Sequence, residues 1–275
     1  MMSDKTVQKS TSLVVFIITA TLMIFLSMAF MSSSYAASSF DQNDSNSIFF
    51  DPLYKLAKDG DARAQFVLAR KFKDGDGVRR SYTQAIYWYK KAVELDFGPA
   101  MIDLGQMYTN GHGVEVNFKE AVKLFSAAAD QGMVTAAFNL GNMYRLGHGV
   151  KIDMPKAVEY YLKAAEKGFL KAQYNLALMY LYGQGVKPDE KQVAHWYTKA
   201  AEQGYAPAQF YLANMYEEGR GVEKNLIDAY RWYALAAEGG ESNAYESLQL
   251  LSMNMKADEL AEAKKRVSEN NVAAQ

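Results

Sequence analysis

The sequence predicts an all-α protein in which pairs of helices stack side by side into a solenoid. Three observations predict it. A Gly-x-Gly motif recurs at a constant spacing of 36 residues, an amphipathic segment precedes each copy, and an aromatic-rich helical segment follows each copy. The five copies of the motif are Gly75–Gly77, Gly111–Gly113, Gly147–Gly149, Gly183–Gly185 and Gly219–Gly221.

Each repeat begins with a segment, here named helix A, whose first position is alanine in every copy. These alanines are Ala64, Ala100, Ala136, Ala172 and Ala208. The fifth position is always leucine, the sixth is alanine or glycine, and the ninth is phenylalanine or tyrosine. Positions one, five and nine fall on one side of a 3.6-residue helix, which indicates an amphipathic helix. The small sixth residue lets a second helix approach closely.

The Gly-x-Gly motif ends helix A, because glycine adopts left-handed dihedral angles at little steric cost. A residue that can cap a helix follows in every copy, so the second helix, helix B, begins at a fixed point. The capping residues are Ser81, Asn117, Asp153, Asp189 and Asn225. Helix B then carries two adjacent packing positions, which are Trp88–Tyr89, Leu124–Phe125, Tyr160–Tyr161, Trp196–Tyr197 and Trp232–Tyr233.

These columns divide the chain into four parts. We expect a signal peptide or membrane anchor at 1–36, a flexible linker at 37–52, and the solenoid at 53–255, with a half repeat, five full repeats and a partial sixth. The partial repeat starts at Ala244 and lacks the glycine loop. A C-terminal capping helix and tail are expected at 256–275, with the helix from about Asp258 to Val267.

The amino-terminal segment predicts export. Lys5 and Lys9 precede an uncharged stretch of 19 residues, from Leu13 to Met31, and Ser34-Tyr35-Ala36 offers small residues at the positions that a signal peptidase reads. We expect cleavage after Ala36 and a periplasmic location. If the segment stays uncleaved, residues 13–31 are long enough to tether the chain to the inner membrane, with the repeats outside the cytoplasm.

Composition excludes several classes of function. The net charge is −1, from 30 basic and 31 acidic side chains, and this balance gives no electrostatic footprint for nucleic acid. The absence of cysteine excludes disulfides, thiolate–zinc sites and cysteine nucleophiles. We expect no cofactor, no metal and no nucleic-acid partner.

The repeat pattern A-x-x-x-L-G-x-x-Y-x-x-G-x-G-V, followed by a capped helix ending in W-Y-x-K-A-A-E-x-G, resembles the Sel-one-like repeat, a relative of the tetratricopeptide repeat. The cleanest copies are 136–168 and 172–204. The resemblance implies a right-handed α-solenoid of antiparallel helix pairs that acts as an adaptor or scaffold for protein partners. Some members are rich in cysteine, with a reported β-lactamase activity, and this chain lacks the cysteines of that branch.

Positions three, seven and ten of helix A lie within about 60° of one another, away from positions one, five and nine. By likeness to tetratricopeptide relatives, this side lines a concave groove that binds a protein or peptide. The expected residues are Phe66, Arg70, Ile102, Gln106, Phe138, Asn142, Arg145, Tyr174, Leu178, Phe210 and Asn214, with Lys73, Thr109, Leu181 and Glu217 completing the columns. The alternative is that the position-three aromatics pack between neighbouring A helices.

Other readings stay open beside the non-enzymatic scaffold. The groove could serve permanent assembly in an envelope complex for motility, secretion or polysaccharide export. A β-lactam or cell-wall hydrolase would need a nucleophile with its base, or paired carboxylates across a pocket, and we find neither pattern. His112 and His148 share a loop position, but repeats stack about 10 Å apart and zinc ligands lie near 2 Å. Two polar loop residues explain them better than a metal site.

Overall fold

The computed structural model describes residues 52–273, which fold into thirteen α-helices without a β-strand. The all-α solenoid with a 36-residue period is therefore confirmed. The expected signal peptide or anchor, and all of the expected linker except Pro52, lie outside the described residues. Within 52–273, none of the helices combines the length and the apolar character needed to cross a bilayer.

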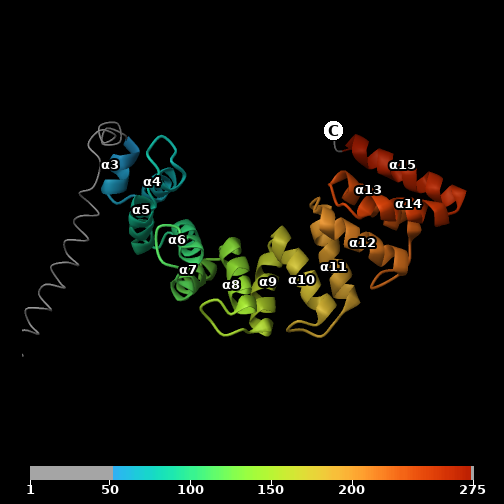
Figure 1. Ribbon diagram of the computed structural model, residues 1–275, viewed down its shortest axis with the longest axis horizontal. Coiled ribbons are helices and arrows are strands. Elements are labelled where there is room, and N and C mark those ends of the chain that lie inside the picture. The colour runs from blue at the N-terminus through green and yellow to red at the C-terminus, as the bar shows by residue number, and fades with distance from the viewer. Residues whose placement is uncertain (1–51, 274–275) are drawn as a thin grey trace, which may run out of the picture. The chain divides into compact units, whose positions relative to one another are not determined.

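The chain forms two compact units, Met1–Ala92 and Val93–Gln275. The described part of the smaller unit holds α3 (Pro52–Lys58), α4 (Ala62–Asp74) and most of α5 (Tyr82–Glu94). The larger unit holds α6 (Gly98–Asn110), α7 (Phe118–Asp130), α8 (Val134–Leu146), α9 (Met154–Glu166), α10 (Leu170–Tyr182), α11 (Glu190–Glu202), α12 (Ala206–Glu218), α13 (Leu226–Glu238), α14 (Ala244–Asn254) and α15 (Ala257–Ala273). In Figure 1, the helices of this larger unit follow one another in chain order.

Five helix pairs correspond to the five repeats, from α4–α5 as the first to α12–α13 as the fifth. Each A helix ends at the first glycine of the Gly-x-Gly motif. This glycine has φ between 66° and 78°, and its backbone N–H donates to a carbonyl of the last helical turn. The predicted role of this glycine as a left-handed C-cap is confirmed.

Helix B begins at the predicted capping residues. The side chains of Asn117, Asp153, Asp189 and Asn225 each accept a hydrogen bond from a backbone N–H in the first helical turn. The backbone N–H of each capping residue also donates to the carbonyl of position nine of helix A, for example from Asp153 to Tyr144 at 2.9 Å. The turn between the two helices is thus held at both of its ends.

The core of each repeat is the face that helix A shares with helix B. The leucine of position five and the second aromatic of helix B are almost fully buried in every repeat. Position six is small for a steric reason: a Cβ atom added to Gly141 would lie 2.7 Å from the Tyr161 ring. The predicted close approach of the two helices is confirmed there.

Neighbouring repeats of the larger unit are joined through backbone as well as side chains. The second glycine of the third motif, Gly149, lies against the start of α7 in the preceding repeat, and a Cβ atom on it would be 2.5 Å from the Phe118 carbonyl. Buried amides add a second joint. Gln173 and Gln209, at position two of α10 and α12, donate to backbone carbonyls at the end of the preceding B helix at 3.1 Å.

The array ends with α14 and α15. Helix α14 takes the place of a sixth helix A, and α15 packs back on α13. Ala263 of α15 is completely buried, and Arg266 lies 3.8 Å from Asp228 of α13. Helix α15 runs to Ala273, beyond the expected end near Val267, and the ion pair of Lys265 with Glu269, one turn apart at 3.8 Å, supports this extension.

We predict that Gly149→Ala destabilises the protein more than Gly168→Ala. Both glycines have positive φ, 76° and 82°, so both changes strain the backbone. Only the Gly149 substitution also forces a Cβ atom into the neighbouring repeat, whereas nothing lies within 4 Å of a Cβ on Gly168. Thermal unfolding followed by circular dichroism should show the larger loss of melting temperature for Gly149→Ala; equal losses would contradict the backbone contact.

We also predict that a chain ending at Met255 is less stable than the full chain, because removing α15 uncovers the face of α13 that it packs against. The melting temperature should fall by at least a few degrees, at about 2–4 °C for each kcal/mol in a chain of this size. A truncated chain that melts unchanged and stays soluble would show that α15 does not cap the array.

Candidate functional site

The predicted groove residues lie on the A helices, and their three columns behave differently. At position three, Phe66, Phe138, Tyr174 and Phe210 are half-buried, and each ring centroid lies 5.7–6.0 Å from the second helix-B aromatic of its own repeat. Ile102 is buried. One side of each aromatic ring at position three therefore packs in the core of its own repeat.

Position-three aromatics also reach the next repeat in the larger unit. The Phe138 ring lies 5.0 Å from Phe169, and the Tyr174 ring lies 5.1 Å from Tyr205. Phe169 and Tyr205 are the residues just before α10 and α12. The interpretation that these aromatics pack between neighbouring A helices thus describes one of their two contacts, and their partly exposed edges border the surface.

Positions seven and ten of the larger unit surround the tip of the second helix-B aromatic. In the third repeat, the Tyr161 hydroxyl donates to Asn142 Oδ1 at 2.7 Å and accepts from Arg145 Nε at 3.2 Å. Asn175, at position four of the next helix A, also hydrogen-bonds Tyr161. Three side chains from two repeats thus meet at one buried hydroxyl, and we name this arrangement the tyrosine node.

The fifth repeat has the same node with a different charge. The Tyr233 hydroxyl lies 2.8 Å from Asn214 Oδ1 and 2.8 Å from Glu217 Oε2, two acceptors that share its proton. Ser247, at position four of α14, hydrogen-bonds the same hydroxyl. The Asn214 amide is held in place because its Nδ2 donates to the Phe210 carbonyl at 2.9 Å. An arginine in the third repeat is thus replaced by a glutamate two repeats later.

The fourth repeat breaks the pattern. Its hydroxyl, on Tyr197, is buried and has no hydrogen-bond partner. Positions seven and ten are Leu178 and Leu181, and position four of the next helix A is Tyr211, whose ring stacks on Tyr197 at 5.4 Å. A buried hydroxyl without a partner costs about 1–3 kcal/mol. Fold stability alone would therefore favour a polar residue in place of Leu178.

The second repeat shows the opposite exception. Its helix-B aromatic is Phe125, which has no hydroxyl, and the equivalent position four of the next helix A is Asn139. The Asn139 Nδ2 atom is buried and has no partner. Across the larger unit, the polar groups of the node therefore pair only where tyrosine and its polar neighbours occur together, in the third and fifth repeats.

Burial is the largest influence on the pKa values of these tyrosines. It raises the pKa of Tyr197, of Tyr233 and of Tyr161, although the Arg145 hydrogen bond lowers the pKa of Tyr161 in part. It also raises the pKa of Tyr174 to about 12, with neighbouring tyrosines and Glu241 adding to the shift. All four hydroxyls are protonated at neutral pH, and those of Tyr161 and Tyr233 act as hydrogen-bond donors.

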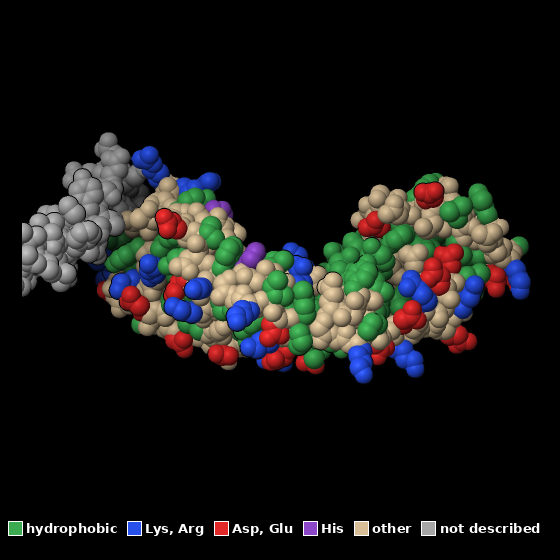
Figure 2. Space-filling model, turned by 60° about the horizontal axis from the view of Figure 1, so that its bottom comes forward, with side chains coloured by type: hydrophobic (Ala, Val, Ile, Leu, Met, Phe, Trp, Pro, Cys, Tyr) green, Lys and Arg blue, Asp and Glu red, His purple; other side chains and the backbone are tan. Residues whose placement is uncertain are grey.

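Leu178 and Leu181 belong to a larger apolar surface on α10 and α12. Tyr182 at position eleven of α10 is 66% exposed, and Tyr211 at position four of α12 is 39% exposed. Together with Leu178, Leu181 and Tyr174 they form what we name the aromatic patch. In Figure 2, hydrophobic side chains gather right of the centre, on the larger unit, in keeping with this patch.

Sequence reasoning missed Tyr182 and Tyr211. A signal was present, since positions four, seven and eleven are spaced by three and four residues and share a helix face. The groove was instead assigned to positions three, seven and ten. Val67 and Tyr211 at position four, and Leu146 and Tyr182 at position eleven, are exposed. We name the solvent-exposed side of the A helices, to which these positions contribute, the outward face.

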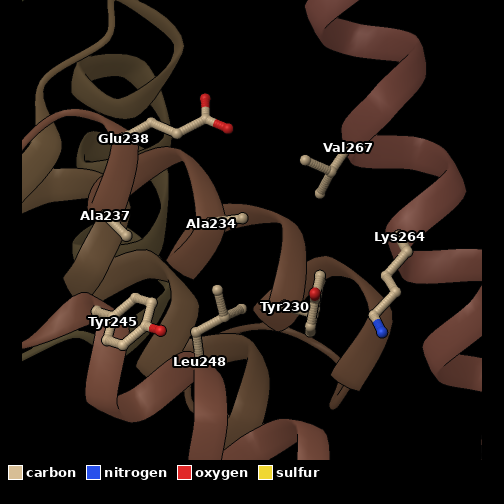
Figure 3. Close-up of a pocket in the computed structure, with 8 residues that line it drawn as sticks. All are labelled: Tyr230, Ala234, Ala237, Glu238, Tyr245, Leu248, Lys264 and Val267. Carbon is tan, nitrogen blue, oxygen red and sulfur yellow. The ribbon is translucent and has the colours of Figure 1, made fainter.

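A second hollow lies near the C-terminus, where α13, α14 and α15 meet. It has a volume of about 430 Å³ and is wide open to solvent. Figure 3 shows its lining, which is Tyr230, Ala234, Ala237, Glu238, Tyr245, Leu248, Lys264 and Val267. Glu238 and Lys264 come from opposite sides of it, and the rest of the lining is apolar or aromatic, which offers packing surface.

Packing contacts, rather than a metal ion, account for the position of the loop histidine His148. His148 stacks on Phe118 with ring centroids 4.3 Å apart and 18° between the planes. Among residues 52–273, no three side chains of histidine, aspartate or glutamate converge as a metal site would require. The stacking explains the position of His148 as packing between the third motif and the start of α7.

The Sel1 repeat family model matches five consecutive segments, 62–97, 98–133, 134–169, 170–205 and 206–241. The chain belongs to the Sel1 repeat family. Sel1 repeats generally mediate protein–protein interaction, and the family is typically non-enzymatic. The matched segments coincide with the five helix pairs, so the family resemblance inferred from the motifs is confirmed.

Solved structures show the same fold. The Sel1 repeat chain is 34% identical to c5321, a protective antigen present in uropathogenic Escherichia coli strains, with a TM-score of 0.73 over 79% of this chain and 48% of that one. It is 30% identical to a Sel1 repeat protein from Oxalobacter formigenes, with a TM-score of 0.66 over 82% and 92% of the two chains. This chain thus spans about half the length of c5321. No curated protein matches the sequence.

We predict that the same substitution has opposite effects at equivalent nodes. Tyr161→Phe and Tyr233→Phe each remove hydrogen bonds and should lower the free energy of unfolding by about 0.5–1.5 kcal/mol. Tyr197→Phe removes a hydroxyl that has no partner and should leave stability unchanged or raise it. Chemical denaturation of the three variants checks this; a loss for Tyr197→Phe as large as for the other two would contradict the unpaired hydroxyl.

Proposed function

We propose that this Sel1 repeat protein is a non-enzymatic scaffold of the bacterial cell envelope, which binds a protein or peptide partner on the outward face of its A helices. The observation that carries the proposal is the aromatic patch. It exposes Tyr182 and Tyr211 beside the partly buried Leu178 and Leu181, where positions seven and ten of the other repeats carry polar side chains.

The chemistry of the patch fits protein recognition. Exposed aromatic rings with few charges supply large contact areas at a small cost in side-chain entropy, and tyrosine is enriched at binding hot spots. Asn142 and Asn214 flank the patch on α8 and α12. Two of the predicted groove residues, Tyr174 and Leu178, are part of the patch, while Phe138 and Asn142 also hold helix B in place.

The location is part of the proposal. Lys5 and Lys9, the uncharged stretch at 13–31 and Ser34-Tyr35-Ala36 support export, with the repeats outside the cytoplasm. Sequencing the amino terminus of protein from fractionated cells tests it, and a start at Ala37 is the expected result. Full-length chain confined to the cytosol would overturn the envelope location without touching the binding proposal.

Site-specific photocrosslinking in intact cells tests the binding surface. We predict that a photoreactive phenylalanine analogue in place of Tyr182 traps a protein partner, because this position belongs to the aromatic patch and is well exposed. The same analogue in place of Lys163, an exposed residue of helix B in the third repeat, is the matched control. Trapping from position 163 and not from position 182 would place the binding surface on the B helices.

Substitutions confirm the trapping result without disturbing the core. Tyr182→Ser should weaken capture of the trapped protein at least about tenfold, as expected for an interface hot spot, with helical circular dichroism unchanged. Lys163→Ala and Lys199→Ala should leave capture intact. Phe138 and Asn142 are unsuitable for this purpose, because changes there also remove contacts with Tyr161.

A further inference from the structure

The fourth repeat carries an unusual combination of residues that stability does not explain. At positions seven and ten, the third repeat has Asn142 and Arg145, and the fifth has Asn214 and Glu217. Each pair satisfies a buried tyrosine hydroxyl. Leu178 and Leu181 leave Tyr197 unsatisfied. Local rules that are broken at a cost to stability tend to mark functional positions.

The two neighbours of this apolar repeat carry opposite charges. Arg145 bonds Tyr161 through Nε, so its Nη groups take no part in that bond and can meet a carboxylate. On the other side, Glu217 bonds Tyr233 through Oε2, and Oε1 takes no part in that bond. Glu241 adds negative charge near Tyr174, while Glu218 is paired with Arg220.

We propose that the aromatic patch binds an extended peptide segment with a large apolar side chain at its centre, an acidic side chain on the α8 side and a basic side chain on the α12 side. This rests on the proposed function and names the chemistry of its partner. The apolar side chain lies against Leu178, Leu181 and Tyr182. The acidic side chain pairs with Arg145 and the basic one with Glu217.

The spacing of the partner follows from the repeat. Packed helices lie about 8–10 Å apart, so we take about 10 Å as the spacing of successive A helices, and an extended peptide rises by about 3.3 Å for each residue. Each charged side chain of the peptide therefore lies about three residues from the apolar one. A peptide with Asp, Phe and Lys separated by two serines each meets this requirement.

Binding of such labelled peptides to the full-length chain, measured by fluorescence anisotropy, tests the proposal. The Asp–Phe–Lys peptide should bind, and exchange of its Phe for Ser should weaken binding at least about tenfold. Peptides with Asp at both flanks or Lys at both flanks should bind about two- to fivefold more weakly, the size expected for solvent-exposed ion pairs.

Variants of the chain assign each contact. Leu178→Asn with Leu181→Arg copies the third repeat into the fourth; this variant should fold, because Asn gives Tyr197 an acceptor, and it should lose the peptide. Arg145→Glu should prefer the peptide with Lys at both flanks, and Glu217→Lys the peptide with Asp at both flanks. Lys163→Ala is the control and should bind like the unchanged chain.

The outcomes separate this proposal from the proposed function. If no peptide binds, or if binding ignores the flanking charges, while position 182 still traps a protein in cells, the peptide chemistry is wrong and the scaffold function stands. If position 182 traps nothing and no peptide binds, both fail. Reversal of charge preference in the Arg145→Glu and Glu217→Lys variants would support the peptide orientation directly.

Discussion

Burial of one helix-B aromatic between two repeats is the contact on which the larger unit depends. Tyr161 shows it most fully. Its ring fills the space left by Gly141 and lies against Phe138, and its hydroxyl bonds the same helix A and, through Asn175, the next one. Because a single side chain contacts both repeats, formation of one repeat and its stacking on the next stabilise each other.

The polar groups of the tyrosine node differ from repeat to repeat. Hydroxyl and acceptor occur together in the third and fifth repeats, the hydroxyl is missing in the second, and the acceptor is missing in the fourth. The ring is buried in all four cases, so the hydrophobic contact is constant and the polar contact varies. Packing therefore sets the architecture, and the node adjusts local stability and the character of the outward face.

Much of the fold was predictable, because its determinants are local. A left-handed glycine, a capping side chain and a small residue at position six each act within one repeat, and five copies display them in the sequence. The node was not predictable in this way. Tyr161 and Asn142 are 19 residues apart in the chain. Their hydrogen bond depends on the distance between helix A and helix B, and residue types alone do not give this distance.

The exposed face was only partly predictable for a related reason. A helical wheel divides a helix into two sides, but helix A of a solenoid has neighbours in its own repeat and in the repeats before and after. Position three consequently faces helix B and the next repeat, as Phe138 does, while positions four and eleven contribute Tyr211 and Tyr182 to the surface. The columns of residue types describe each helix separately, whereas the stacking of the repeats decides which neighbouring side chains share a face.

An array of near-identical repeats faces a problem of register. If every repeat presented the same groove chemistry, an extended partner could bind shifted by one repeat with little loss of affinity, and recognition would not be specific. One apolar repeat between neighbours of opposite charge removes this degeneracy, because a shifted partner would place its apolar side chain on Asn142 or Asn214 and its charges on leucine. The unsatisfied Tyr197 hydroxyl is then the structural cost of making one repeat different from the others.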